Sequence, residues 1–179
     1  LSRYLLTKGE AGAEELARIL AQIPWAGQSV GNHELAPPRK ELLAFFAAAQ
    51  KEGLPLLAAN VRCAAGGGAG AICDTVGTAT GATPFRLVEH GPLRIAVTAV
   101  IDPEIKDLVS RSRLEGLEIL DPAASLSELV PRMREAGADL IFAMVHLGSR
   151  ESSRKAEQLA GRVDGVDLMV TNGLFETLS

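Results

Sequence analysis

Long apolar runs are missing from this sequence. None approaches the roughly 20 residues that a membrane-spanning helix needs, and no signal peptide is visible. An excess of basic residues is missing as well, because 22 acidic side chains against 18 basic ones give a formal net charge of -4. Nucleic-acid binders neutralise phosphates with clustered Lys and Arg. The composition therefore argues against a membrane span and against a nucleic-acid polymer as a partner.

Methionine is absent from the first position, and cysteine is scarce. The chain begins at Leu1, so we expect either a fragment or a product from which an upstream segment was removed. Its two cysteines, Cys63 and Cys73, flank the segment AAGGGAGAI. A flexible loop of this kind can close a disulfide, which would indicate an oxidising compartment; two unrelated thiols are the alternative.

The residues that are present alternate between helical and strand patterns. A chain of 179 residues, 47% of them hydrophobic, can form one domain with a sizeable core, and we interpret residues 1–179 as a single domain. Apolar residues at helical spacing predict helices at 10–23, 39–52 and 151–162, and another that begins at Ser125 or Ser127. Apolar runs predict strands at 54–61, 138–148 and 166–173, and a hairpin at 85–101. The alternation predicts an α/β fold with helices outside a mixed sheet.

The predicted helix at 39–52 has one apolar face. Its predicted buried stripe consists of Leu42, Phe45, Phe46 and Ala49. The segment from Cys63 to Thr83 has no clear periodicity and is the predicted long loop.

Polar side chains stand where several predicted strands end. Asn32-His33-Glu34 follow a short run, Asn60 ends PLLAAN, and His146 ends the most apolar strand. Active sites of open α/β folds collect beyond the carboxyl ends of strands. Taken alone, Asn-His-Glu is equally well explained as a turn and helix cap, and a lone histidine is more often structural than a metal ligand. His90 lies in the hairpin turn, and we expect it to be solvated surface.

The motif order resembles the calcineurin-like metallophosphoesterases, and most closely their 5'-nucleotidase branch. Five segments carry the resemblance over nearly the whole chain: GNHE, LPLLAANV, FRLVEHGPLRIAVTAVIDP, ADLIFAMVHLG and VDLMVTNG. The resemblance implies a four-layer α/β/β/α sandwich with mixed sheets and a dinuclear metal site at the strand ends. It also implies hydrolysis of a nucleotide or a similar small phosphate ester, and an exported or periplasmic location.

The resemblance also implies roles for individual residues. Asn32, through its side-chain oxygen, and His146 would be metal ligands, and His33 would act as acid or transition-state stabiliser beside the phosphate. Asn60 is a further candidate for substrate binding. The cofactors would be divalent ions such as Mn, Zn, Fe or Mg. Paired cations generate a nucleophile at neutral pH and screen the charge that grows on phosphoryl oxygens.

Two parts of the family pattern are not found. An Asp-x-His strand and a Gly-Asp pair are expected before GNHE but do not occur in residues 1–30, so the domain would be N-terminally incomplete. The two later histidines of a Gly-His-x-His motif fall on Gly173 and Phe175, which cannot bind metal. A second hypothesis is therefore a catalytically degenerate relative without metal, which would serve as a binding or assembly subunit with a protein partner. A third is an α/β domain whose polar strand ends are only structural.

Overall fold

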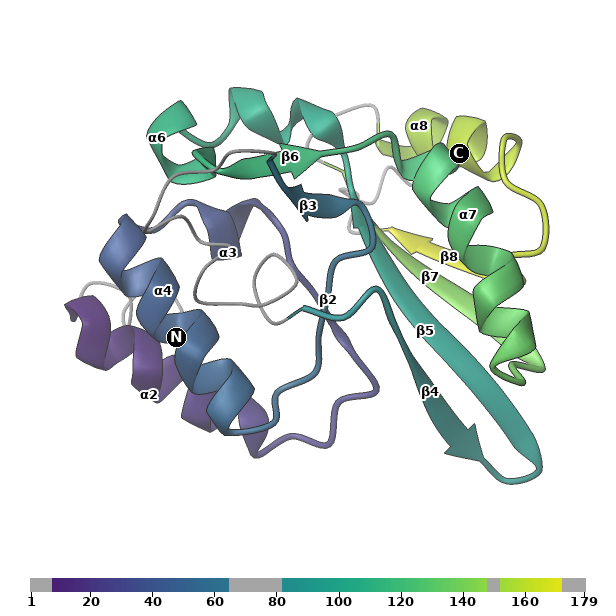
Figure 1. Cartoon of the computed structure of the whole chain (residues 1–179), viewed down its shortest axis with the longest axis horizontal. Helices are drawn as coiled ribbons and strands as arrows, with labels where there is room; N and C mark the ends of the chain where they lie inside the picture. The colour runs from purple at the N-terminus through teal and green to yellow at the C-terminus, as the bar shows by residue number, and fades with distance from the viewer. Residues whose placement is uncertain (1–7, 65–81, 148–151, 172–179) are drawn as a thin grey trace, which may run out of the picture.

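The computed structural model of the chain (Figure 1) describes residues 8–64, 82–147 and 152–171. The elements follow one another as α2 (Gly9–Ala21), β1 (Gln28–Ser29), α3 (Asn32–Leu35), α4 (Arg39–Lys51), β2 (Leu56–Leu57), β3 (Val61–Cys63), β4 (Phe85–His90), β5 (Leu93–Ile101), the 3-10 helix η1 (Pro103–Asp107), α6 (Arg111–Leu114), β6 (Leu117–Ile119), α7 (Pro122–Glu135), β7 (Leu140–His146), α8 (Ser152–Ala160) and β8 (Leu168–Thr171).

The largest sheet contains four strands in the order β4-β5-β7-β8. β4 and β5 form the predicted hairpin, which turns at Gly91 with a φ of 59°, a conformation that glycine reaches without strain. β5, β7 and β8 run parallel, and the register places Ile101 opposite His146. The carboxyl ends of β5 and β7 therefore lie side by side at one edge of this sheet.

Helices cover the sheets from two sides (Figure 1). α2 and α4 pack on each other and on the small parallel sheet of β1 and β2. Leu57 of β2 packs against Val97 and Ala99 of β5, so this small sheet faces the large one. α7 and α8 cover the other face of the large sheet, where Val100 and Ala143 are buried. The layers therefore follow the order α/β/β/α, which confirms the predicted fold class.

α4 buries the stripe that the sequence predicts. Its buried residues are Leu42, Phe45, Phe46 and Ala49. The same core cluster includes Val30 and Leu35, which lie on either side of Gly31-Asn32-His33-Glu34. The helical core thus supports the segment that was predicted to carry a site.

The apolar run at 54–61 does not form one strand, and that prediction is wrong. β2 pairs in parallel with β1, whereas β3 pairs in antiparallel fashion with β6 in a separate sheet. Asn60 lies at the switch between the two sheets and is fully buried. Its Nδ2 donates to the carbonyls of Ile101 (2.7 Å) and Leu120 (2.9 Å), and its Oδ1 accepts from the Ile101 amide (2.9 Å). These side-chain bonds to two neighbouring segments fix the position at which the strand breaks.

α7 begins before Ser125 and Ser127, so both predicted caps are wrong. The side chain of Asp121 accepts a hydrogen bond of 2.8 Å from the Ala124 amide, and Pro122 is at the start of the helix. An Asp cap satisfies an otherwise unpaired amide, and a proline in the first turn loses no helical hydrogen bond. Ser125 is consequently a buried residue inside the helix.

Most of the predicted Cys63–Thr83 loop, residues 65–81, lies outside the described residues. Among the helices that the structure describes, none combines the length and the apolar character needed to cross a membrane.

Candidate functional site

Two predicted site residues, Asn32 and His146, contact each other although they are 114 positions apart. Asn32 is the first residue of α3, shortly after β1, and His146 is the last residue of β7. The Oδ1 atom of Asn32 lies 2.8 Å from the Nε2 atom of His146. The side-chain oxygen predicted as one metal ligand therefore touches the imidazole predicted as another. We call Asn32, His33 and His146 together the strand-end corner.

Gly31 makes this contact possible. A Cβ atom built on Gly31 would lie 2.5 to 2.8 Å from three atoms of the His146 ring, a separation that real Cβ atoms do not adopt. The backbone of Gly31 is extended, so the requirement for glycine comes from the neighbouring ring and not from the backbone dihedral angles. No signal for this role is present in the sequence, because glycine before a helix is common for other reasons.

We predict that Gly31→Ala displaces the His146 ring and separates it from Asn32. Forcing a methyl group into this contact should also lower the free energy of unfolding by about 1–3 kcal/mol. Imidazole ¹H–¹⁵N spectra should show altered His146 signals, and urea unfolding should report the loss of stability. Gly161→Ala is the matched control, since its Cβ would make only ordinary contacts, the nearest at 3.5 Å from the Glu157 carbonyl. Unchanged His146 signals in Gly31→Ala would contradict the packing argument.

The Nε2 atom of His146 lies near two groups of Asn32. Nε2 lies 2.8 Å from Asn32 Oδ1 and 3.4 Å from the Asn32 amide nitrogen. One ring nitrogen cannot donate and accept at once, and an amide oxygen only accepts. A protonated Nε2 would donate to Oδ1, and an unprotonated Nε2 would accept from the Asn32 amide, so the tautomer of the ring decides which of these two bonds forms. Burial, followed by the nearby charge of His33, lowers the pKa of His146, and both effects favour the neutral ring.

His33 completes the corner from an exposed position. It follows Asn32 in α3, its side chain is exposed, and its charge acts on His146. An exposed imidazole beside a half-buried one that bonds to Asn32 is free to meet a molecule that arrives from solvent.

Glu34, which was not among the predicted site residues, stabilises this turn. Its carboxylate accepts a hydrogen bond of 2.9 Å from the Gly31 amide, which closes the turn that carries Asn32 and His33. Burial raises the pKa of Glu34, against lowering contributions from the backbone hydrogen bonds and from His33. The G-x-x-E spacing of a capping arrangement is the signal in the sequence for this role.

Asn60 forms its side-chain hydrogen bonds with backbone groups and not with the residues of the strand-end corner. Its amide is 0% exposed, and both polar atoms bond to backbone groups of β5 and of the segment after β6. These bonds explain the residue without a substrate, so its role in substrate binding stays a prediction that no contact supports. His90 is exposed at the end of β4, as expected.

The described donors do not fit a dinuclear metal site by themselves. Asn32 and His146 supply two ligand atoms, and these atoms are bonded to each other. No group of three or more His, Cys, Asp or Glu side chains that could hold an ion occurs among residues 8–64, 82–147 and 152–171. Catalytic zinc sites, for comparison, use three protein ligands for one ion. We therefore derive no chemical step through metal ions from the described residues.

Three residues that entered the sequence-based predictions lie outside the described residues: Cys73, Gly173 and Phe175. Cys63, at the end of β3, is disulfide-bonded and has no free thiol. Its pairing with Cys73 stays a prediction.

Solved structures share this fold. The calcineurin-like phosphoesterase YfkN from Bacillus subtilis superposes with a TM-score of 0.67 at 19% identity, over 94% of this chain and 52% of that chain. The 5'-nucleotidase precursor from Thermus thermophilus gives 0.68 at 19% identity, over 96% and 31%. The NAD nucleotidase NadN from Haemophilus influenzae gives 0.61 at 18% identity, over 84% and 26%.

The comparisons with sequences add no match. No protein-family model matches this chain, and no curated protein sequence does. The chain spans about half or less of the length of these solved structures. Their activities therefore cannot be assigned to this chain from the superpositions. At identities below 20%, these superpositions show a shared fold and do not show a shared reaction. The chain therefore shares its fold with these solved phosphoesterase and nucleotidase structures and covers only part of their length.

Proposed function

We propose that this chain is the part of a phosphoester hydrolase domain that carries the strand-end corner. The supporting observation is the 2.8 Å contact between Asn32 and His146, which come from the segment after β1 and from the end of β7 and meet beside the exposed His33. A fold shared with phosphoesterases supports the same proposal. Our interpretation of residues 1–179 as a single, partial domain belongs to it.

The proposed substrates are small phosphate esters, including nucleotides. Solved structures named as nucleotidases share the fold, which supports this substrate class. His33 is the group placed to protonate a leaving ester oxygen, because its ring is exposed whereas the His146 ring is held by Asn32. Divalent ions such as Mn, Zn, Fe or Mg would supply charge stabilisation in this class of reaction. The proposal requires that further ligands join Asn32 and His146 from outside the described residues.

We predict that His33→Ala lowers the rate of phosphate release from glycerol 2-phosphate by about a hundredfold or more, as expected for removal of a general acid that protonates an alkoxide leaving group. The rate is measured on the full-length protein with Mn²⁺ added. His90→Ala is the matched control, because it removes another exposed imidazole at the end of β4 and should leave the rate unchanged. Equal rates for the wild type and His33→Ala would show that His33 is not the general acid.

A second candidate function is a degenerate subunit that binds or assembles with a protein partner. The donor count favours it, since the two candidate ligand atoms satisfy each other and the described residues contain no larger ligand group. A folded full-length protein with the Asn32–His146 contact intact, no bound metal and no hydrolysis would select this candidate.

An exported or periplasmic location is also part of the proposal. The disulfide-bonded state of Cys63 supports it, because structural disulfides persist in oxidising compartments. Alkylation of the protein from cell extracts, before and after reduction, would test the state of this thiol.

A further inference from the structure

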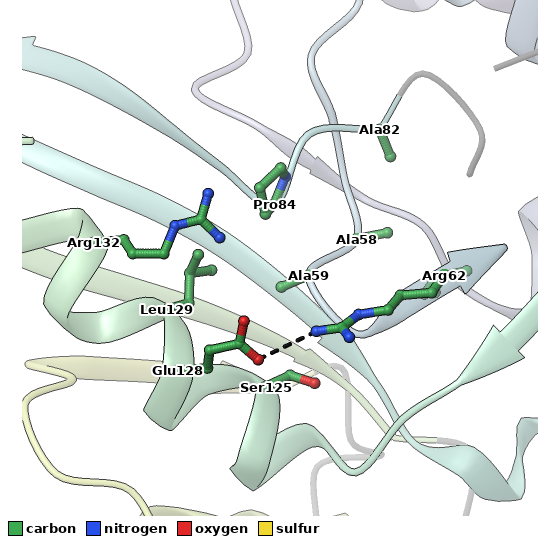
Figure 2. Close-up of a pocket in the computed structure, with 10 residues that line it drawn as sticks. Ala58, Ala59, Arg62, Ala82, Pro84, Ser125, Glu128, Leu129 and Arg132 are labelled. Atoms are coloured by element: carbon green, nitrogen blue, oxygen red, sulfur yellow. Dashed lines mark hydrogen bonds and ion pairs between the residues drawn. The ribbon is translucent and has the colours of Figure 1, made fainter. Parts of the chain in front are cut away.

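A cavity of about 260 Å³ lies between α7 and the segment that joins β2 to β3 (Figure 2). Its wall on one side is a stripe of α7, in which Ser125, Glu128, Leu129 and Arg132 follow at helical spacing. Arg62 of β3 reaches toward it from the opposite side. None of the strand-end corner residues lines this cavity.

The charged side chains around the cavity are Arg62, Glu128 and Arg132. Glu128 and Arg132 stand four positions apart on α7, a spacing that ordinarily favours an ion pair. Glu128 instead pairs with Arg62, at 3.2 Å. The guanidinium of Arg132 has no hydrogen bond or ion pair with any described residue. Its positive charge is therefore available to an anion in the cavity.

A hydroxyl group, that of Ser125, belongs to the same stripe of α7. Ser125 is 6% exposed, and its hydroxyl has no hydrogen-bond partner within the described parts of the chain. Because Ser125 lines the cavity, this hydroxyl can form a hydrogen bond with a molecule that binds there. Between Ser125 and Arg132 the α7 stripe carries the apolar Leu129 beside the charged Glu128, and Ala82 and Pro84 from the segment before β4 add apolar lining.

We propose that this cavity binds a short aliphatic monocarboxylate that carries a hydroxyl or carbonyl group at its far end. Arg132 binds the carboxylate, Leu129 contacts the aliphatic body, and Ser125 bonds to the distal polar group. The single guanidinium charge of Arg132 matches one negative charge. A phosphate dianion fits less well, because its second charge would lie near the carboxylate of Glu128. The volume is just below the range of drug-sized pockets, which agrees with a small ligand.

The probe is 5-hydroxypentanoate, titrated into the full chain and followed by ¹H–¹⁵N chemical shifts. We expect saturable shifts in α7 and near Arg62, and binding that is on the order of tenfold weaker in Arg132→Gln, which loses a charge-assisted hydrogen bond. Arg111→Gln removes an exposed arginine from α6, outside the cavity, and should leave the affinity unchanged. Glu128→Gln should tighten binding, because it frees the guanidinium of Arg62.

Two further ligands and one variant make the proposal falsifiable. The uncharged 5-hydroxypentanamide should bind much more weakly, and Ser125→Ala should reduce the affinity for 5-hydroxypentanoate more than for pentanoate. Equal binding of the amide, or an unchanged affinity in Arg132→Gln, would overturn the proposal. Inorganic phosphate that bound more tightly than 5-hydroxypentanoate to the same residues would overturn the assignment of a monocarboxylate.

Discussion

Asn60→Ala should lower the free energy of unfolding by about 3 kcal/mol. The substitution leaves the Ile101 amide and the Ile101 and Leu120 carbonyls without their present partner, and each buried unpaired polar group costs about 1–3 kcal/mol. The loss is large because one amide side chain joins β5 to the segment after β6, at the point where the chain switches sheets. Urea unfolding followed by circular dichroism measures the change.

Asn32→Ala provides the matched control for this prediction. It removes the same kind of side chain at a half-buried position. The side-chain oxygen of Asn32 bonds to one partner, the His146 ring. Its expected cost is about 1 kcal/mol, the usual net contribution of one hydrogen bond. If Asn60→Ala were no more destabilising than Asn32→Ala, the structural role assigned to Asn60 would be wrong. Substrate binding would then become the better explanation for the residue.

Phe46→Ala should be at least as destabilising, with a loss of about 3–5 kcal/mol. Phe46 is 1% exposed in the core between α2 and α4, and its ring meets that of Phe45 edge to face, with centroids 5.6 Å apart. Removing the ring leaves a cavity in the cluster that also holds Val30 and Leu35. Because these two residues flank the strand-end corner, the substitution should also broaden the imidazole signals of His33 and His146.

Phe46→Leu separates loss of volume from loss of hydrophobic character. It keeps an apolar side chain in the same place, so its cost should be well below that of Phe46→Ala, at about 1–2 kcal/mol. The midpoint of urea unfolding should therefore rank wild type above Phe46→Leu, and Phe46→Leu above Phe46→Ala. Equal midpoints for the wild type and Phe46→Ala would show that α4 does not pack as described.

The predictions from sequence succeeded where a periodic pattern decides the structure. The stripe of α4 follows from a period of 3.6 residues, and β7 follows from an almost unbroken apolar run in a sheet covered on both faces. The contact of Asn32 with His146 also agrees with the expectation that polar strand ends meet at one edge of the sheets.

The predictions failed where a single polar contact overrides the pattern. The run at 54–61 is apolar throughout except for Asn60, yet it divides between two sheets because the Asn60 amide bonds to two neighbouring segments. The α7 cap lies at Asp121, four residues before the nearer predicted serine, because Pro122 allows an earlier start. The requirement for glycine at position 31 depends on a ring that is distant in sequence, so no local pattern could reveal it.

The proposal that the strand-end corner serves a phosphoester hydrolase requires metal ligands in addition to Asn32 and His146. Metal analysis of the full-length protein, purified and dialysed with Mn²⁺ or Zn²⁺, tests it most directly. The account predicts a bound pair of divalent ions and a clear loss of metal in both Asn32→Ala and His146→Ala, with no loss in His90→Ala. A folded wild-type protein without metal, or with metal that neither corner substitution removes, would contradict the proposal.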